Sequence, residues 1–290
     1  MLIKGEFSLQ KIAWITDSTC YIDPEYAKQN NIFVVPIGIT FENETYKDGI
    51  DIREEELYSK LSTSRTLPKT SQPVIGELVD LFEELKTEYD LAIAVHLSTE
   101  LSGTANATKQ AADMAGFPLE LVDSRLISLP VAHLIRKGQE LIREGVSPED
   151  TATTLRAMYQ SNKLYVMIGS LEQLHKGGRV SAIQMLMGSL LQIKPILTFE
   201  DGKLIPYDKV RSQRKALSYM VARLKDDLDQ GVSIKTVYIL EGSAKQEALS
   251  IQEQVRSLLP EIEIIIGPLG SAIGVHAGAG TIALTWFKEE

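Results

Sequence analysis

The sequence predicts an α/β protein with two domains, and two observations support this. In the first half, short β-rich runs alternate with helical patterns, which is typical of βαβ units forming a mostly parallel sheet flanked by helices. In the second half, a hairpin signal occurs among the crossovers, which favours a mixed or antiparallel sheet. The 290 residues and their 44% hydrophobic content suffice for two cores. We expect an N-terminal domain over residues 1–162 and a C-terminal domain over residues 163–290.

The first elements are two strands and a short helix. Residues 11–16 (KIAWIT) have the apolar, β-branched composition of a buried strand, and residues 32–41 (IFVVPIGITF) predict a second strand interrupted by a proline and a glycine. Asp51, with Glu54 three residues later, is a variant of the capping box and predicts a helix over residues 53–61.

The rest of the N-terminal half alternates in the same way. Apolar residues recur every three or four positions after Pro73, which predicts a helix with one buried face. The elements expected next are a strand at 91–97, a small-residue helix at 103–115, a strand at 119–123 and a helical region at 127–160, which Gly145 interrupts and Ser147 recaps.

The C-terminal half contains more closely spaced strands. We expect strands at 163–169, 194–210, 236–242, 262–268 and 281–287, with helices over about 213–229 and 245–259. The Asp-Gly pair at 201–202 divides the second of these segments and is a hairpin signal.

The composition narrows the functional class. A net charge of -9 argues against a nucleic-acid partner, because such proteins usually present a basic face. Cys20 is the only cysteine, so an internal disulfide and a cysteine-based zinc site are excluded, which fits a reducing compartment. We find neither a secretory signal pattern nor the ~18 uninterrupted apolar residues of a membrane helix. We therefore expect a cytoplasmic protein without stable membrane insertion.

Polar residues follow the first predicted strand. Asp17 and Ser18 lie where open α/β sheets place their ligands, at the carboxyl end of a strand. Asp17 has the chemistry of a nucleophile or a metal ligand, but the second aspartate of a phosphatase-type motif is missing. A turn or cap role for either residue is the simpler interpretation.

Two further segments place hydroxyl groups before predicted helices. Thr70 and Ser71 precede one helix, and Ser102 and Thr104 flank Gly103 at the start of another. These hydroxyls would ordinarily cap the helices. Alternatively, two helix N-termini converge on one anion, because each combines a hydroxyl donor with the positive end of a helix dipole.

The remaining candidates lie in the second half of the chain. Arg179 and Arg211 are either solvated surface charges or cations at the mouth of a ligand site. Residues 181–197 (SAIQMLMGSLLQIKPIL) are apolar and rich in methionine, which fits ordinary core or the wall of a pocket for an alkyl ligand.

His276 lies inside GSAIGVHAGAG, residues 270–280, where glycines would let bare backbone approach a ligand. A GxGxxA match within this segment does not indicate nucleotide binding, since a strand rather than a helix is expected after it. The sequence contains no metal-binding histidine spacing, no GxSxG elbow and no P-loop, so we expect no metal and no cofactor.

Taken together, these segments resemble the DegV family, fatty-acid-binding proteins that are the lipid-carrying subunits of bacterial fatty acid kinase. The matching segments are TDSTC at 16–20, TSQP at 70–73, SGT at 102–104, GRVS at 178–181, KPIL at 194–197 and GVHAG at 274–278. The resemblance implies a fatty acid buried between two α/β domains. It also implies a non-catalytic subunit that presents the lipid carboxylate to a separate ATP-dependent kinase subunit.

The resemblance assigns roles to individual residues. It implies that Thr70 and Ser102 bind the carboxylate, that His276 completes their polar network, and that Arg179 and Arg211 lie near the partner or the incoming phosphate. It places Asp17, Ser18, Ser71, Gly103, Thr104, Gly274 and Gly278 around the pocket. Ala105 and Ala279 depart from the family pattern and put the acyl-chain preference in question.

Two other functions remain open from the sequence. One is a small-molecule hydrolase or transferase that uses Asp17 or Ser18 with His276. The other is a regulatory protein that senses a lipid without delivering it to a kinase.

Overall fold

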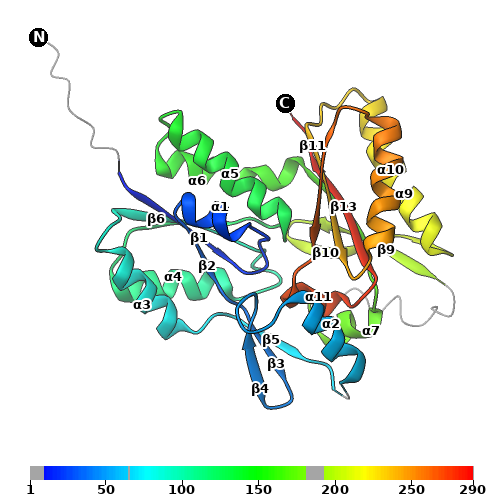
Figure 1. Ribbon diagram of the computed structural model, residues 1–290. Helices are drawn as coiled ribbons and strands as arrows, with labels where there is room; N and C mark the ends of the chain where they lie inside the picture. Colours follow the sequence, from blue (N-terminus) through cyan, green and yellow to red (C-terminus); the bar gives the residue numbers. More distant parts are fainter. Residues whose placement is uncertain (1–9, 65, 181–192, 290) are drawn as a thin grey trace, which may run out of the picture.

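The described residues, 10–64, 66–180 and 193–289 of a computed structural model, form three β-sheets with helices packed around them (Figure 1). The helices are α1 (Pro24–Gln29), α2 (Glu54–Thr63), α3 (Ile75–Leu85), α4 (Thr104–Ala115), α5 (Leu129–Arg143), α6 (Pro148–Ala157), η1 (Met158–Ser161), α7 (Leu171–Lys176), α9 (Gln213–Asp229), α10 (Lys245–Leu258) and α11 (Ser271–Ala277). No helix in these ranges is long and apolar enough to cross a membrane.

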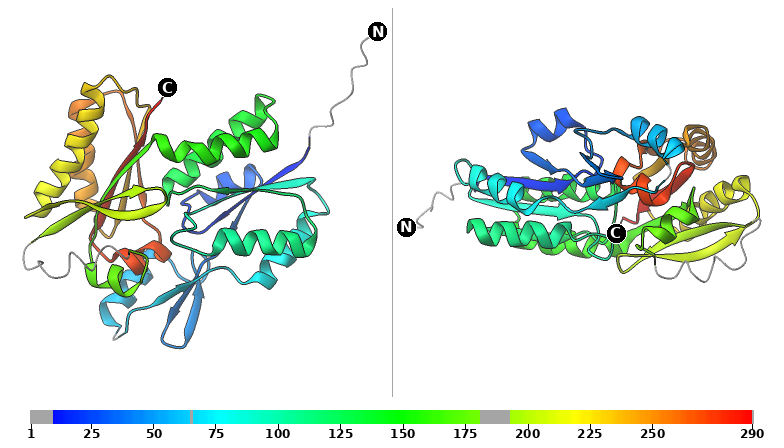
Figure 2. Two further views of the ribbon diagram at one scale, coloured as in Figure 1. Left: turned by 180° about the vertical axis from the view of Figure 1, so that it is seen from behind. Right: turned by 90° about the horizontal axis from the view of Figure 1, so that it is seen from below.

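The N-terminal sheet is parallel, as the βαβ pattern predicts. Its strands are β1 (Ile12–Asp17), β2 (Ile32–Val35), β6 (Leu91–His96) and β7 (Leu119–Asp123), in the order β2-β1-β6-β7. Helices cover both faces (Figure 2). Ala13, Ala92 and Ala94 let α3 and α4 pack closely on one face, while Trp14 and Ile93 contact the core beneath α5 and α6 on the other.

A small antiparallel sheet was not anticipated from the sequence. It consists of β3 (Gly38–Phe41), β4 (Glu44–Lys47) and β5 (Lys69–Ser71), in the order β4-β3-β5. The strand expected over residues 32–41 is divided between this sheet and the N-terminal sheet, because Pro36 between β2 and β3 cannot donate to a β-ladder.

The expected capping box before α2 is also displaced. Arg53 is the residue that caps this helix, and its backbone N–H donates to the Glu56 carboxylate at 3.2 Å. Asp51 instead accepts a hydrogen bond from the Lys47 backbone N–H at 2.8 Å, so it stabilises the turn after β4.

The C-terminal sheet is mixed, as predicted. Its strands are β8 (Asn162–Met167), β9 (Lys194–Glu200), β10 (Lys203–Val210), β11 (Thr236–Gly242), β12 (Glu263–Pro268) and β13 (Thr281–Phe287), in the order β10-β9-β8-β13-β11-β12. Only β11 and β12 pair in parallel among these described strands. Asp201 and Gly202 form the hairpin turn with positive φ angles of 46° and 80°, as the Asp-Gly signal indicates.

The two large sheets share one hydrophobic core. Helices α9 and α10 cover one face of the C-terminal sheet. From its other face, Val166, Leu240 and Phe287 join a cluster that includes Trp14 and Leu134 of the N-terminal half. The division of the chain after residue 162 stays our proposal; in the structure β8 begins at this position.

His133 on α5 connects the two halves. Its ring stacks on Phe287 of β13, with centroids 4.2 Å apart and an interplanar angle of 15°. Its Nδ1 shares a hydrogen bond of 2.8 Å with the Tyr238 hydroxyl on β11. Burial lowers the pKa of His133 from an ordinary 6.5 to about 4, so the ring is neutral at physiological pH.

His133→Gln should therefore change how stability depends on pH. Between pH 6.5 and pH 4 the unfolded chain binds a proton at this position that the folded protein rejects, so folding loses stability as pH falls. By pH 5 this loss is ~2 kcal/mol. Urea unfolding should show the stability gap between wild type and variant narrowing by that amount from pH 7 to pH 5. A gap that stays constant would contradict the assignment.

Candidate functional site

A cavity of about 400 Å³ lies between the two halves of the molecule, within the size range of small-molecule sites. Its apolar walls include Leu97, Ile127, Val166, Phe199, Leu204 and Leu269. The polar side chains of the lining are Thr19, Thr70, Ser71, Gln72, Thr99, Glu100, Ser102, Arg179, His276 and Thr281. The cavity thus combines apolar walls with a substantial set of polar groups.

Thr70 and His276 meet at this cavity although 206 positions separate them. A hydrogen bond of 2.8 Å joins Thr70 Oγ1 in β5 to His276 Nε2 in the last turn of α11. Burial, together with the nearby Arg179 cation, lowers the pKa of His276 to about 4. The imidazole is therefore neutral at physiological pH.

The other ring nitrogen of His276 faces the start of the loop after α7. Nδ1 is buried and has no hydrogen-bond partner among the described residues. A Cβ atom at Gly177 would lie 2.3 Å from it, so only glycine fits beside the ring. Arg179 lies two residues further on, lines the cavity and donates from Nη1 to the Gly177 carbonyl oxygen.

Ser102 also lines the cavity, in the loop between β6 and α4. Its Oγ accepts a hydrogen bond from the Thr104 N–H at 3.3 Å and lies 2.9 Å from the Thr104 hydroxyl. Capping therefore accounts for part of the role of Ser102. It does not account for Thr70 and Ser71, which form a β-strand, while the cap of α3 is Val74 without a side-chain hydrogen bond.

The two hydroxyl-bearing segments pack against each other. A Cβ atom at Gly103 would lie 2.1 Å from Oε1 of Gln72, so the Gln72 side chain reaches the start of α4. Ser71 packs instead against Gly38 of the neighbouring strand. The structure thus brings Thr70 and Ser102 to one cavity, and α4 begins beside Ser102.

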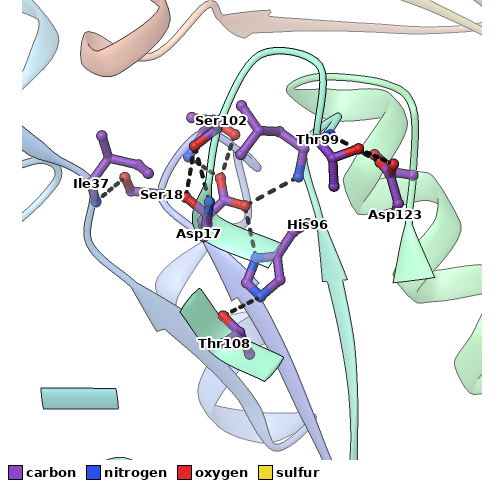
Figure 3. Close-up of polar contacts among 12 residues, drawn as sticks. Asp17, Ser18, Ile37, His96, Thr99, Ser102, Thr108 and Asp123 are labelled. Carbon is purple, nitrogen blue, oxygen red and sulfur yellow. Dashed lines mark hydrogen bonds and ion pairs between the residues drawn. The ribbon is translucent and has the colours of Figure 1, made fainter. Parts of the chain in front are cut away.

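Asp17 is fully buried at the end of β1, and Figure 3 shows its contacts. The carboxylate accepts hydrogen bonds from the Thr19 backbone N–H at 3.1 Å, the Thr19 hydroxyl, the Leu97 N–H at 3.2 Å and His96 Nδ1 at 2.9 Å. His96 Nε2 in turn contacts the Thr108 hydroxyl at 2.9 Å. Asp17 therefore fixes the loops that follow β1 and β6.

Asp48 forms a second buried junction. Its Oδ2 accepts from the Ser18 hydroxyl at 2.8 Å and from the Ala272 N–H at 3.3 Å. Burial raises the pKa of this carboxyl, and these hydrogen bonds partly oppose the shift. Ser18 Oγ also accepts from the Ile37 N–H. Asp48 thus links the loop after β1 to the first turn of α11, the helix that carries His276.

These contacts bear on the hydrolase alternative that the sequence left open. Asp17 pairs with His96, Ser18 with Asp48, and His276 with Thr70, so the pairing of Asp17 or Ser18 with His276 that this alternative requires is not made in the structure. Within the described residues, no group of three or more His, Cys, Asp or Glu side chains is placed to hold a metal ion.

The glycine-rich segment also differs from expectation. It forms the short helix α11, which packs against α2 and α7 (Figure 1). A Cβ at Gly274 would lie 2.8 Å from the Tyr58 hydroxyl of α2, and one at Gly278 would lie 2.5 Å from Ser170 Cβ before α7. These glycines let helices approach one another, and neither lines the cavity.

The two candidate arginines are placed differently. Arg179 is exposed at the cavity lining, whereas Arg211 is exposed between β10 and α9 and is not among the described lining residues. The methionine-rich part of the predicted pocket wall, residues 181–192 with Ser181 of the GRVS motif, lies outside the described residues.

Sequence reasoning missed His96 and Asp48. A histidine inside an otherwise apolar strand was the available signal for His96, because a buried polar ring needs partners. Asp48 gave no signal, since its partners come from distant parts of the chain.

The fold and cavity define an α/β protein with two large sheets and a partly open, largely apolar cavity between its halves. The chain belongs to the DegV family: the family described as "Uncharacterised protein, DegV family" matches residues 11–289. Protein DegV of Bacillus subtilis is 35% identical over 277 residues, covering 95% of this chain and 98% of the relative. A DegV domain-containing protein of Halalkalibacterium halodurans is 33% identical over 284 residues, covering 97% and 100%.

Solved structures show the same fold. The crystal structure of DegV from Bacillus subtilis, described as a fatty acid binding protein, superposes with a TM-score of 0.87 at 35% identity, covering 97% of this chain and all of the other. A DegV family protein from Thermus thermophilus, described by its fatty acid binding, gives a TM-score of 0.89 at 26% identity, covering 96% and 100%.

The junction at Asp17 leads to a stability prediction. Asp17→Asn replaces an acceptor-only group by an amide whose NH₂ must face a donor, so unfolding free energy should fall by about 2–4 kcal/mol. Asp123→Asn is the matched control, because Asp123 ends β7 and accepts from Thr99 and Arg125 while partly exposed. In chemical denaturation, the free energy of unfolding of Asp123→Asn should fall by less than half as much as that of Asp17→Asn. Equal losses would contradict the importance of burial at Asp17.

Proposed function

We propose that this protein binds one long-chain fatty acid in the cavity between its domains, with the carboxylate at Thr70, Ser102 and His276. The observation that carries the proposal is the cavity itself: its apolar lining residues occur together with the hydrogen-bonded Thr70–His276 pair and the Ser102 hydroxyl. An elongated apolar molecule with one polar end matches this distribution. The fatty acid binding described for the Bacillus subtilis and Thermus thermophilus relatives supports the same ligand.

The polar end suits a carboxylate that must remain reactive. Thr70 and Ser102 offer hydroxyl donors, and the N-terminus of α4 adds the positive end of a helix dipole. Arg179 is the single Lys or Arg among the described lining residues, and it is exposed. A cradle of neutral donors avoids a buried ion pair, in which a lysine or arginine would hold the oxygen tightly.

His276 acts in this proposal by orienting Thr70. If Nε2–H donates to Thr70 Oγ1, the Thr70 hydroxyl proton is free to donate to the carboxylate. The unprotonated Nδ1 then faces the side of Arg179, whose positive charge favours a lone pair over an N–H group. This tautomer accommodates the buried, unpartnered Nδ1 better than the alternative one.

We propose further that the bound carboxylate is presented to a separate kinase subunit and that this chain is not catalytic alone. A carboxylate oxygen would attack the γ-phosphorus of ATP, forming the acyl phosphate while the bond to the β-phosphate oxygen breaks and ADP leaves. The sequence lacks a P-loop, which supports a partner as the source of the nucleotide site. We place this reaction in the cytoplasm, and the chain itself would need no cofactor.

The lipid assignment predicts what purified protein contains. Protein from a bacterial host should release fatty acids of about 14 to 18 carbons on denaturation, as detected by mass spectrometry.

The carboxylate assignment predicts a loss of affinity. The double variant Thr70→Val with Ser102→Ala should have a Kd for fatty acid at least tenfold higher, since hydrogen bonds to a charged group contribute about 1.5–3 kcal/mol each. The control is the double variant Thr45→Val with Ser161→Ala, which loses two hydroxyls outside the cavity. Its Kd for fatty acid should equal that of wild type. Unchanged affinity in the first double variant would remove the carboxylate assignment.

The kinase assignment predicts a different effect for the arginines. Arg179→Ala and Arg211→Ala should keep the fatty acid Kd within about twofold, because neither guanidinium is needed by a carboxylate held by hydroxyls. Each should lower the rate at which the kinase subunit from the same bacterium forms acyl phosphate. Lys225→Ala, which removes an exposed charge paired with Asp229, is the control. If wild type binds the fatty acid but the kinase subunit forms no acyl phosphate from it, a lipid-sensing regulator would be the favoured function.

A further inference from the structure

The turn of the β9–β10 hairpin docks between two loops of the N-terminal half. The hairpin, yellow-green in Figure 2, points its turn toward these loops, which follow β6 and β7. Ser98, fully buried at the start of the loop after β6, donates its hydroxyl to the Gly202 carbonyl oxygen at 2.7 Å. The Ser98 N–H donates to Leu126 O, so the two loops are also joined to each other.

Charged side chains surround this hydrogen bond. Arg125 Nη1 lies 3.5 Å from Asp201 Oδ1, and the Tyr159 hydroxyl lies 3.3 Å from the same oxygen. Lys203 and Glu100 form a longer ion pair at 3.7 Å. We call these contacts and the Ser98–Gly202 hydrogen bond the tip clamp.

Gly202 gives the clamp its close fit. Its φ of +80° is unfavourable for other residues, and a Cβ atom there would lie 2.6 Å from Ser98 Oγ and 3.3 Å from Arg125 Cβ. Exposed ion pairs add little to such a contact, so the buried hydrogen bond and the glycine fit dominate it.

The base of the hairpin is anchored in the C-terminal half: Ile196 and Leu197 are fully buried, and the Tyr207 ring packs against Tyr165 and Tyr219. β10 is an edge strand of the C-terminal sheet, and β9 pairs with β8 through Ile196, Leu197 and Thr198. Phe199 and Leu204, which face each other across the hairpin, both line the cavity. The hairpin is therefore a cavity wall anchored at its base by the sheet and the core, and held at its turn by the tip clamp.

We propose that the β9–β10 hairpin is the gate of the cavity and that the tip clamp is its latch. Release of the clamp swings Phe199 and Leu204 out of the cavity wall, so that a fatty acid enters or leaves between the hairpin and the loop after β6. The inference rests on the proposed fatty acid binding. It assigns Ser98 and Gly202 to the control of ligand exchange, whereas Thr70, Ser102 and His276 set affinity.

Stopped-flow fluorescence with cis-parinaric acid, a fluorescent fatty acid, tests the gate. Ser98→Ala and Gly202→Ala should raise the association and dissociation rates together, by about five- to tenfold, because a weaker latch opens more often. The Kd should change less than threefold. Gly231→Ala is the matched control, since Gly231 has the same positive φ of +81° but no neighbour near its added Cβ, and it should exchange as wild type does.

A covalent latch tests the same idea in the opposite direction, by holding the clamp closed. Ser98→Cys with Gly202→Cys places two sulfur atoms at the clamp, where the close approach suits a disulfide, and the native Cys20 is buried elsewhere. Oxidation should slow both rates at least tenfold relative to the reduced double variant, and reduction should reverse this slowing.

The outcomes separate the two proposals. Wild type that fails to bind cis-parinaric acid or natural long-chain fatty acids would overturn the proposed function and the gate with it. Wild type that binds, with rates unchanged in both clamp variants and in the oxidised double-cysteine protein, would overturn the gate alone. A rise in dissociation rate alone, with a matching rise in Kd, would also overturn the gate, since that is the result of losing a ligand contact.

Discussion

Two buried aspartates hold together the parts of the chain that form the polar end of the cavity. Asp17 joins the end of β1 to the loop after β6, which carries Ser102, and Asp48 joins the loop after β1 to α11, which carries His276. Burying a carboxylate is costly unless hydrogen bonds replace its water, and both side chains meet this condition through backbone and hydroxyl donors. The proposed ligand-binding groups can stay neutral because the two carboxylates that position them, those of Asp17 and Asp48, lie outside the cavity lining.

This arrangement makes the site a property of the whole fold. Ser102 comes from the carboxyl edge of the parallel sheet, where open α/β sheets place their ligands, but Thr70 belongs to the small antiparallel sheet and His276 to a helix packed beside it. The apolar wall adds residues such as Val166 and Phe199 from the C-terminal sheet. Changes in how the two halves pack therefore reach the polar end and the wall together.

Much of the fold could be predicted from the sequence, because periodicity and turn chemistry act locally. The parallel sheet, the Asp-Gly hairpin and the Ser147 cap of α6 are confirmed. The small sheet and α11 could not be predicted, since three-, four- and seven-residue elements depend on tertiary packing. At the site, the importance of Thr70, Ser102 and His276 came from resemblance to a family. The Thr70–His276 contact itself spans 206 positions, and no local pattern encodes it.

Glycines that suggest loops in the sequence allow close contacts between segments in the structure, and these contacts bear on how the cavity exchanges its contents. Gly274 and Gly278 fix α11 against α2 and α7, where every neighbour is a packed side chain or backbone. Gly202 also allows a close approach, but its partners are one hydroxyl and exposed charges at the edge of a sheet. A contact that is specific in geometry and modest in energy can release without unfolding the core. For this reason the structure favours motion at the hairpin over motion at α11, and His276 can stay in place while the wall opens.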